Sequence, residues 1–277
     1  MLPYKTAAAA SAAIGRNLTA AESLWLRYSA TAPDFLLYSH NIVFLLIVYA
    51  LAPLPLSFIS LYFPNSIRLY KIQPNATPLS PATVLLCFRR VVATFLLTVG
   101  PLQIFSFPAI RCIGIRTGLP LPSGCEMAAQ IAVYFVVEDF LHYWIHRGLH
   151  TRWGYDRIHR VHHEFRTPMG YAAPYAHWAE VVALGMPAFV GPAAVPGHIV
   201  TFWLWMVIRH VEAIETHCGY DFPHTPTKYI PFYCGAEYHD FHHYVGGQTR
   251  CNFASIFTYC DYIYGTDKGY RYHKSQL

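Results

Sequence analysis

An uncharged apolar stretch runs from Phe35 to Phe63 and restricts this chain to a small set of folds. At about 1.5 Å of rise per residue, a helix of this length can cross a bilayer core of about 30 Å. Pro53 and Pro55 are expected to kink that helix. Only 13% of the 277 residues are charged, against about 25% in a typical soluble domain. We therefore expect an integral membrane protein.

The sixteen histidines are not spread evenly along the chain. Three are spaced four residues apart, which places them on one face of a helix. Two further runs have the pattern HxxHH, which on a helix brings the first histidine close to the fourth and fifth positions. We expect each run to offer two or three imidazoles to a common metal centre. The three runs comprise His142, His146 and His150, then His159, His162 and His163, then His239, His242 and His243.

The number of clustered histidines exceeds what one metal ion needs, because a single zinc is held by three or four ligands. Imidazole suits zinc, copper, iron and nickel. A redox-active pair of irons fits the count, and the absence of an HExxH sequence disfavours zinc hydrolysis. His177 and His217 are further candidate ligands, and nearby carboxylates are candidates to accept the second imidazole N–H. These carboxylates are Glu138, Asp139, Asp156, Glu164 and Asp240.

Three more apolar stretches cover residues 84–110, 127–145 and 178–208. The last has prolines and glycines at its middle, and it separates two histidine runs that one metal site needs on the same side of the membrane. We therefore expect a hairpin with two helical arms at 178–208. Five arginines between 147 and 166 favour the cytoplasmic side for the histidines. The scattered basic residues and the net charge of +5 give no reason to expect a nucleic-acid partner.

These expectations define the fold class as an all-α integral membrane protein. It has about four hydrophobic helical segments or hairpins and a cytosolic, histidine-rich helical cap that holds a dinuclear metal site. Residues 1–34 are expected to form a flexible or amphipathic segment. Residues 35–277 are expected to form a single membrane-embedded domain with its metal-binding core at 138–250.

The chain resembles the fatty-acid-hydroxylase superfamily and, within it, the plant-type sterol 4-alpha-methyl oxidase (methylsterol monooxygenase) family. The resemblance is strong over residues 125–271. It is carried by the strings HYWIHRGLH (142–150), HRVHH (159–163), AAPYAHWAE (172–180), ETHCGYDFP (215–223), AEYHDFHHYVGG (236–247) and NFASIFTYCDYIYGTDKGYR (252–271). The family's three histidine boxes fall on His146 and His150, on His159, His162 and His163, and on His239, His242 and His243. The positions of His177 and His217 also recur in the family, whereas plant members often carry a different residue at His142.

The resemblance implies an endoplasmic-reticulum enzyme of several membrane passes with two non-haem irons facing the cytosol. The implied reaction takes the 4-alpha-methyl group of a 4,4-dimethyl or 4-methyl sterol through alcohol and aldehyde to carboxylate. The implied partners are the sterol, membrane lipid, cytochrome b5 with its NADH-dependent reductase, and a sterol decarboxylating dehydrogenase. Three other functions stay open: another di-iron lipid oxidase (a fatty-acid or sphingolipid hydroxylase or a sterol desaturase), a bis-histidine haem carrier, and a zinc protein without redox activity.

Overall fold

The computed structural model describes residues 4–245 and 251–276. This part of the chain is mostly helical, with connecting loops and isolated β-bridges but no strand. The helices are α1 (Ala7–Ile14), α2 (Ala20–Ser29), α3 (Asp34–Leu51), α4 (Leu54–Tyr62), α5 (Pro64–Ile67), η1 (Arg68–Tyr70), α6 (Pro81–Thr94), η2 (Phe95–Val99), α7 (Gly100–Phe105), α8 (Phe107–Ile113), α9 (Gly124–Leu149), α10 (Arg152–Arg157), η3 (His159–Glu164), η4 (Gly170–Ala172), α11 (Trp178–Gly185), α12 (Pro187–Ala194), α13 (Ile199–Thr216), η5 (Pro226–Tyr229), α14 (Gly235–Val245), α15 (Tyr259–Tyr264) and α16 (Lys268–Ser275).

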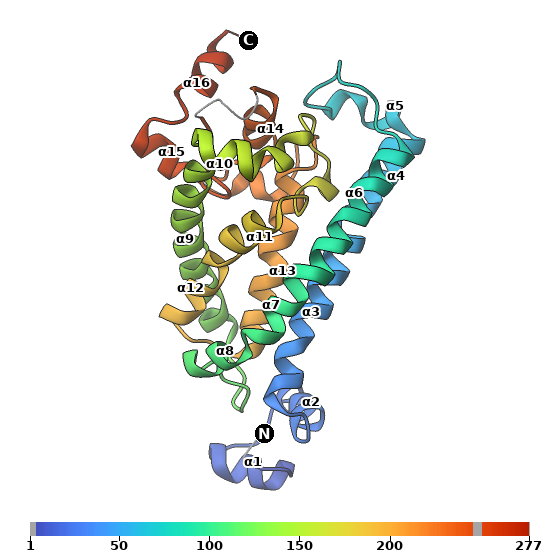
Figure 1. The fold of residues 1–277 in the computed structure, drawn as a ribbon. Helices are drawn as coiled ribbons and strands as arrows, with labels where there is room; N and C mark the ends of the chain where they lie inside the picture. Colours follow the sequence, from blue (N-terminus) through green and yellow to red (C-terminus); the bar gives the residue numbers. More distant parts are fainter. Residues whose placement is uncertain (1–3, 246–250, 277) are drawn as a thin grey trace.

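Two helical runs are long enough and apolar enough to cross a membrane, and they lie together along one side of the molecule (Figure 1). The first, Asp34–Tyr62, comprises α3 and α4. It is interrupted just before Pro53, as expected from the two prolines. The second, Pro81–Phe105, comprises α6, η2 and α7. Two of the four expected apolar stretches thus form such helices among the described residues. In the other two, α9 and α13 carry several charged residues, and α11 and α12 are short.

The second run contains one turn of π-helix at Phe95–Val99, directly before Pro101. The backbone N–H of Gly100 donates to the carbonyl of Phe95, five residues earlier. Proline has no N–H, and its ring clashes with the carbonyl four residues earlier. The wider turn removes that conflict without ending the helix. This irregular turn supplies Phe95 and Val99 to the wall of an apolar cavity.

The proline-rich stretch 178–208 turns back as expected (Figure 1). Helices α11 and α12 form one arm, and α13 begins the return arm at Ile199. The turn is tied to the preceding loop, because Ile199 N donates to Arg116 O at 2.8 Å and Arg116 N donates to Gly197 O at 2.9 Å. The two arms of the hairpin therefore begin and finish at the same end of the molecule. The histidine runs before and after the hairpin share that end.

Helices α9 and α12 cross very closely at Gly191. A Cβ atom built at Gly191 would lie 2.7 Å from the Cα of Tyr134, whose ring packs into the core. We expect Gly191→Ala to destabilise the protein by about 1–3 kcal/mol, since the backbones must separate to admit a methyl group. The check is the thermal midpoint in detergent. Gly185→Ala is the control, because a Cβ there meets nothing within 4 Å, and an equal loss in both variants would contradict the close-packing argument.

Candidate metal centre

Nine of the eleven predicted histidines lie together in two buried groups. Within each group the ligand nitrogens lie within 4.8 Å of one another. The first group contains His146, His150, His159, His163 and His242, and the second contains His162, His217, His239 and His243. The imidazoles come from α9, η3, the end of α13 and α14, so four segments distant in sequence meet at one end of the molecule (Figure 1).

Each HxxHH run contributes to both groups rather than to one. In α14, His239 and His243 are four residues apart and belong to the second group, whereas His242 belongs to the first. In η3 the assignment is reversed. His162 belongs to the second group, whereas His159 and His163, which are four residues apart, belong to the first. Adjacent positions on a helix diverge by about 100°, so the last two histidines of each run point to different centres.

His142 and His177 lie outside both groups. His177 caps the start of α11, where its Nδ1 accepts a hydrogen bond from Ala179 N. His142 stands one turn before His146 on α9, and its Nδ1 lies 3.4 Å from a Glu138 oxygen. The helical spacing places His142 on the same face of α9 as His146. The His142 ring, however, faces Glu138 and Arg209 instead of the grouped histidines.

Five histidines are fixed with Nε2 directed toward the other imidazoles, because their Nδ1 atoms face acceptors. The acceptors are Phe253 O for His146 (2.9 Å), Glu180 Oε1 for His159 (2.8 Å), Tyr175 O for His162 (3.0 Å), Ala213 O for His217 (2.7 Å) and Cys251 O for His242 (2.8 Å). A neutral imidazole that donates through Nδ1 keeps a lone pair on Nε2. This arrangement is typical of metal-bound histidine, whose second nitrogen is held by an outer partner.

In each group two of these lone pairs face one another. The Nε2 atoms of His146 and His159 are 3.1 Å apart, and so are those of His162 and His217. No proton is available between either pair while all four Nδ1 atoms donate. Around an ion with metal–nitrogen bonds of about 2.1 Å, adjacent ligand atoms are about 3.0 Å apart in an octahedron and about 3.4 Å apart in a tetrahedron. The residues present therefore fit one cation in each group.

Burial keeps these imidazoles in the neutral form that binds metals. It lowers the pKa of His162 to about 4, and it lowers the pKa of His242 and His243 well below the usual range, with neighbouring histidines adding to the effect. Both ring nitrogens of His243, and Nε2 of His242, have no hydrogen-bond partner in the described chain. A buried polar atom without a partner is costly, and a bound cation would satisfy His242 Nε2 and one of the two ring nitrogens of His243.

The carboxylate that contacts a grouped histidine is Glu180, which the sequence patterns did not single out. Three of the five carboxylates proposed from sequence bond elsewhere: Asp139 accepts from Ile256 N, Glu164 accepts from the Tyr175 hydroxyl, and Asp240 accepts from Gln73. Glu138 faces His142, which lies outside both groups. Backbone carbonyls take the role expected of the carboxylates at four of the five oriented histidines. Glu180 lies three residues after His177 in the string AAPYAHWAE, so the side chain of that string that contacts a grouped histidine is its last one.

We expect Glu180→Gln to weaken metal binding by about 10–100-fold, because a neutral amide replaces the carboxylate that accepts from His159 Nδ1 and changing the outer partner of a ligating histidine typically has that effect. The measurement is the chelator concentration that removes half of the bound metal from purified protein. Glu237→Gln is the matched control, since Glu237 is an exposed partner of Lys274. Equal metal retention in both variants would contradict a role for Glu180.

The segment after residue 250 holds two of the histidines in place through its backbone. It presents the carbonyls of Cys251 and Phe253 to His242 and His146. The buried Asp261 carboxylate in turn accepts from Phe253 N at 2.9 Å and from Ala254 N at 2.7 Å. Side-chain acceptors thus shape a loop whose carbonyls orient the imidazoles.

A largely apolar cavity of about 560 Å³ opens onto both groups. Histidines from each group line it, including His146 and His217, and its walls come from both candidate membrane runs, the hairpin and α9. Apolar residues such as Phe95, Met186 and Phe189 line the part away from the histidines. This volume lies within the range of about 300–1,000 Å³ typical of small-molecule sites. The arrangement places the candidate metal centre at one end of an apolar pocket.

Comparison with known proteins agrees with this site. The fatty acid hydroxylase family model matches residues 131–266. Methylsterol monooxygenase 1-1 of Arabidopsis thaliana is 60% identical over 100% of this chain and 93% of the relative. Very-long-chain aldehyde decarbonylase GL1-10 of Oryza sativa subsp. japonica is 63% identical over 99% of this chain and 91% of the relative. Methylsterol monooxygenase 2-2 of Arabidopsis thaliana is 44% identical over 81% and 83%.

No solved structure gave a significant match. The full-length similarity to several methylsterol monooxygenases and the family match over the metal-centre region are sufficient to classify the chain. The chain is an oxidoreductase that belongs to the plant methylsterol monooxygenase family, within the fatty acid hydroxylase superfamily.

Proposed function

We propose that this chain is a membrane-bound di-iron monooxygenase that oxidises the 4-alpha-methyl group of 4,4-dimethyl or 4-methyl sterols through alcohol and aldehyde to carboxylate. The observation that carries the proposal is the pair of histidine groups at one end of an apolar cavity. Relatives named methylsterol monooxygenase, 57–60% identical over the whole chain, support the sterol as substrate.

Iron is the metal that best fits both the ligand set and the proposed chemistry. The first group offers five nitrogens, which exceeds the four ligands of a typical zinc site. Its short nitrogen–nitrogen separations are also closer to octahedral than to tetrahedral geometry. Two bound irons would supply the activation of dioxygen that the oxidation of an unreactive methyl group needs. His162, His217, His239 and His243 would hold one iron, and the five histidines of the first group would hold the other.

The protein's own contribution is to position the substrate and to exclude water. The apolar walls favour a sterol skeleton and keep bulk water from the reacting carbon. The two apolar helical runs contribute wall residues such as Leu45 and Phe95, so segments suited to the bilayer form part of the cavity that would hold a lipid-soluble substrate. Acceptors on the outer nitrogens hold the ligating imidazoles in a fixed orientation throughout turnover.

The proposed electron donors are cytochrome b5 and its NADH-dependent reductase, and a sterol decarboxylating dehydrogenase would take the product. Exposed arginines surround the metal end of the molecule and suit an acidic donor protein. They are Arg152, Arg157, Arg160 and Arg166. We also propose an endoplasmic-reticulum location with this end in the cytosol, because excess arginine near membrane segments favours that side.

A second candidate function keeps the metal centre and changes the substrate. The rice relative at 63% identity is named a very-long-chain aldehyde decarbonylase, and an apolar cavity of this size also suits an extended acyl chain. Another lipid oxidase of the superfamily, such as a fatty-acid or sphingolipid hydroxylase or a sterol desaturase, belongs to the same group of alternatives.

The test is a product profile from membranes of a host that lacks its own sterol methyl oxidase and expresses this chain. Labelled 4,4-dimethylsterol and a labelled long-chain aldehyde are supplied in parallel, and the His242→Ala variant serves as the inactive control. We expect 4-carboxysterol with dioxygen and NADH, and no shortened hydrocarbon from the aldehyde. Hydrocarbon formation without sterol oxidation would replace this proposal with the second candidate.

A further inference from the structure

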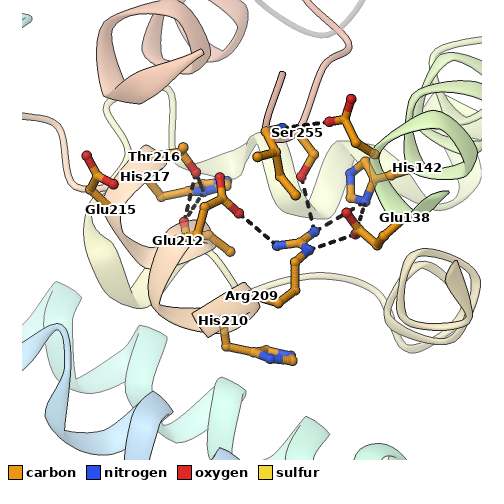
Figure 2. Close-up of polar contacts among 12 residues, drawn as sticks. Glu138, His142, Arg209, His210, Glu212, Glu215, Thr216, His217 and Ser255 are labelled. Atoms are coloured by element: carbon orange, nitrogen blue, oxygen red, sulfur yellow. Dashed lines mark hydrogen bonds and ion pairs between the residues drawn. The ribbon is translucent and has the colours of Figure 1, made fainter. Parts of the chain in front are cut away.

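A buried polar network lies on the cavity wall beside the first histidine group. Arg209 of α13 is at its centre (Figure 2). Its Nε donates to Glu138 Oε1 at 2.7 Å, its Nη1 donates to Glu212 Oε2 at 3.1 Å, and its Nη2 donates to Ser255 Oγ at 3.1 Å. The same Nη2 lies 3.4 Å from His142 Nδ1. Buried ion pairs add little stability over apolar packing, so stability alone does not explain this network.

Four members of the network line the cavity: Glu138, His142, Arg209 and Ser255. His142 directs Nδ1 toward Glu138 and Arg209, so Nε2 is the ring nitrogen left for a ligand. Ser255 accepts the Arg209 N–H through its oxygen, so its own hydroxyl hydrogen is left to donate. When the His142 proton is on Nδ1, facing the Glu138 oxygen, His142 Nε2 is an acceptor. The cavity wall then offers this acceptor and the Ser255 hydroxyl as a donor. That pair matches the hydrogen-bonding needs of an alcohol group.

This pair of functional groups lies directly beside the metal centre. The ring centroids of His142 and His146 are 5.7 Å apart, and His146 belongs to the first group. In a sterol, the 4-methyl group is attached to the carbon next to the one that bears the 3-hydroxyl, so the two groups are in van der Waals contact. A hydroxyl bound at His142 would therefore hold that methyl group against the metal-facing end of the cavity, with the apolar rings directed along the cavity.

We infer that His142 and Ser255 bind the 3-hydroxyl of the sterol substrate, and that Arg209 and Glu138 are positioning residues that orient this pair. The inference rests on the proposed sterol substrate and assigns His142 a role in substrate binding rather than metal binding. The 3-hydroxyl donates to His142 Nε2 and accepts from the Ser255 hydroxyl. No bond is made or broken at this site, whose task is to select and orient the substrate.

The test compares binding of 4,4-dimethylcholestanol with binding of the same hydrocarbon lacking the 3-hydroxyl. The purified proteins are the wild type, His142→Phe, which keeps a ring without hydrogen-bonding nitrogens, and Ser255→Ala. His210→Phe is the matched control, because His210 lines the same cavity but bonds to Met206 O, outside the network. Dissociation constants in detergent and metal content are measured for each protein. The wild type should prefer the hydroxylated ligand by about tenfold or more, as expected for a pair of hydrogen bonds.

We expect each network variant to reduce this preference by about 3–10-fold while retaining its metal, and His210→Phe to keep the wild-type ratio. An unchanged preference in His142→Phe and Ser255→Ala would overturn the inference, and so would loss of metal from His142→Phe. Should His142→Phe fail to fold, Ser255→Ala decides the matter. A wild type that oxidises the sterol but ignores the 3-hydroxyl would overturn this inference alone, whereas a wild type that neither binds nor oxidises sterols would overturn the proposed function with it.

Discussion

His242→Ala and His162→Ala should each abolish turnover and release about one of two bound metals per chain. The two residues belong to different groups, His242 to the first and His162 to the second. Both are buried, and each is oriented by a backbone carbonyl on Nδ1. Losing only the outer partner of a ligand typically lowers affinity or activity by about 10–100-fold. Losing the ligand itself should therefore lower activity by more than about 100-fold.

The measurement is metal content per chain together with turnover in the same preparation. His224→Ala is the control, because His224 is exposed in a loop outside both groups. It should keep the wild-type metal content and rate. Full metal loading with retained turnover in either His242→Ala or His162→Ala would contradict the two-group site.

Arg209→Met should be the most destabilising substitution outside the histidine groups. It removes the partner of Glu138, a carboxylate with no exposed surface. Breaking a buried ion pair by removing one partner costs about 3–5 kcal/mol. For a chain of this size that corresponds to a fall in Tm of about 6–15 °C.

The double variant with Glu138→Gln separates this explanation from a simple loss of packing. Removing the Glu138 charge as well should recover part of the lost Tm, because the uncompensated charge is then gone. Arg116→Met is the control, since the pair of Arg116 with Glu126 is exposed on both sides and should contribute no more than about 1 kcal/mol. A double variant as unstable as Arg209→Met alone would contradict the charge argument.

The sequence predicted the features that depend on local pattern. The proline break in the first apolar helix, the hairpin at 178–208 and the meeting of three histidine runs all follow from spacing and from where prolines are tolerated. The pattern predicted a common centre for His142, His146 and His150, of which only the last two share a group. It did not predict the division of each HxxHH run between two groups, because that division depends on how η3 and α14 face each other.

Other features depend on packing between distant segments, which no local pattern records. Arg209 and Glu138 are 71 residues apart and meet only because α13 packs beside α9. Glu180 reaches His159 because the chain turns before α11. The acceptors for the other four oriented imidazoles are backbone carbonyls, and because every residue has a carbonyl, no sequence pattern marks them. His177 has the spacing of a ligand candidate but is used as a helix cap.

The most direct test of the metal centre is the iron content and Mössbauer spectrum of the wild-type protein purified, without chelators, from cells grown on isotopically enriched iron. The two histidine groups predict two irons per chain in nitrogen-rich coordination, without the visible absorption of haem. A single tightly bound zinc, or iron present only as haem, would contradict the account.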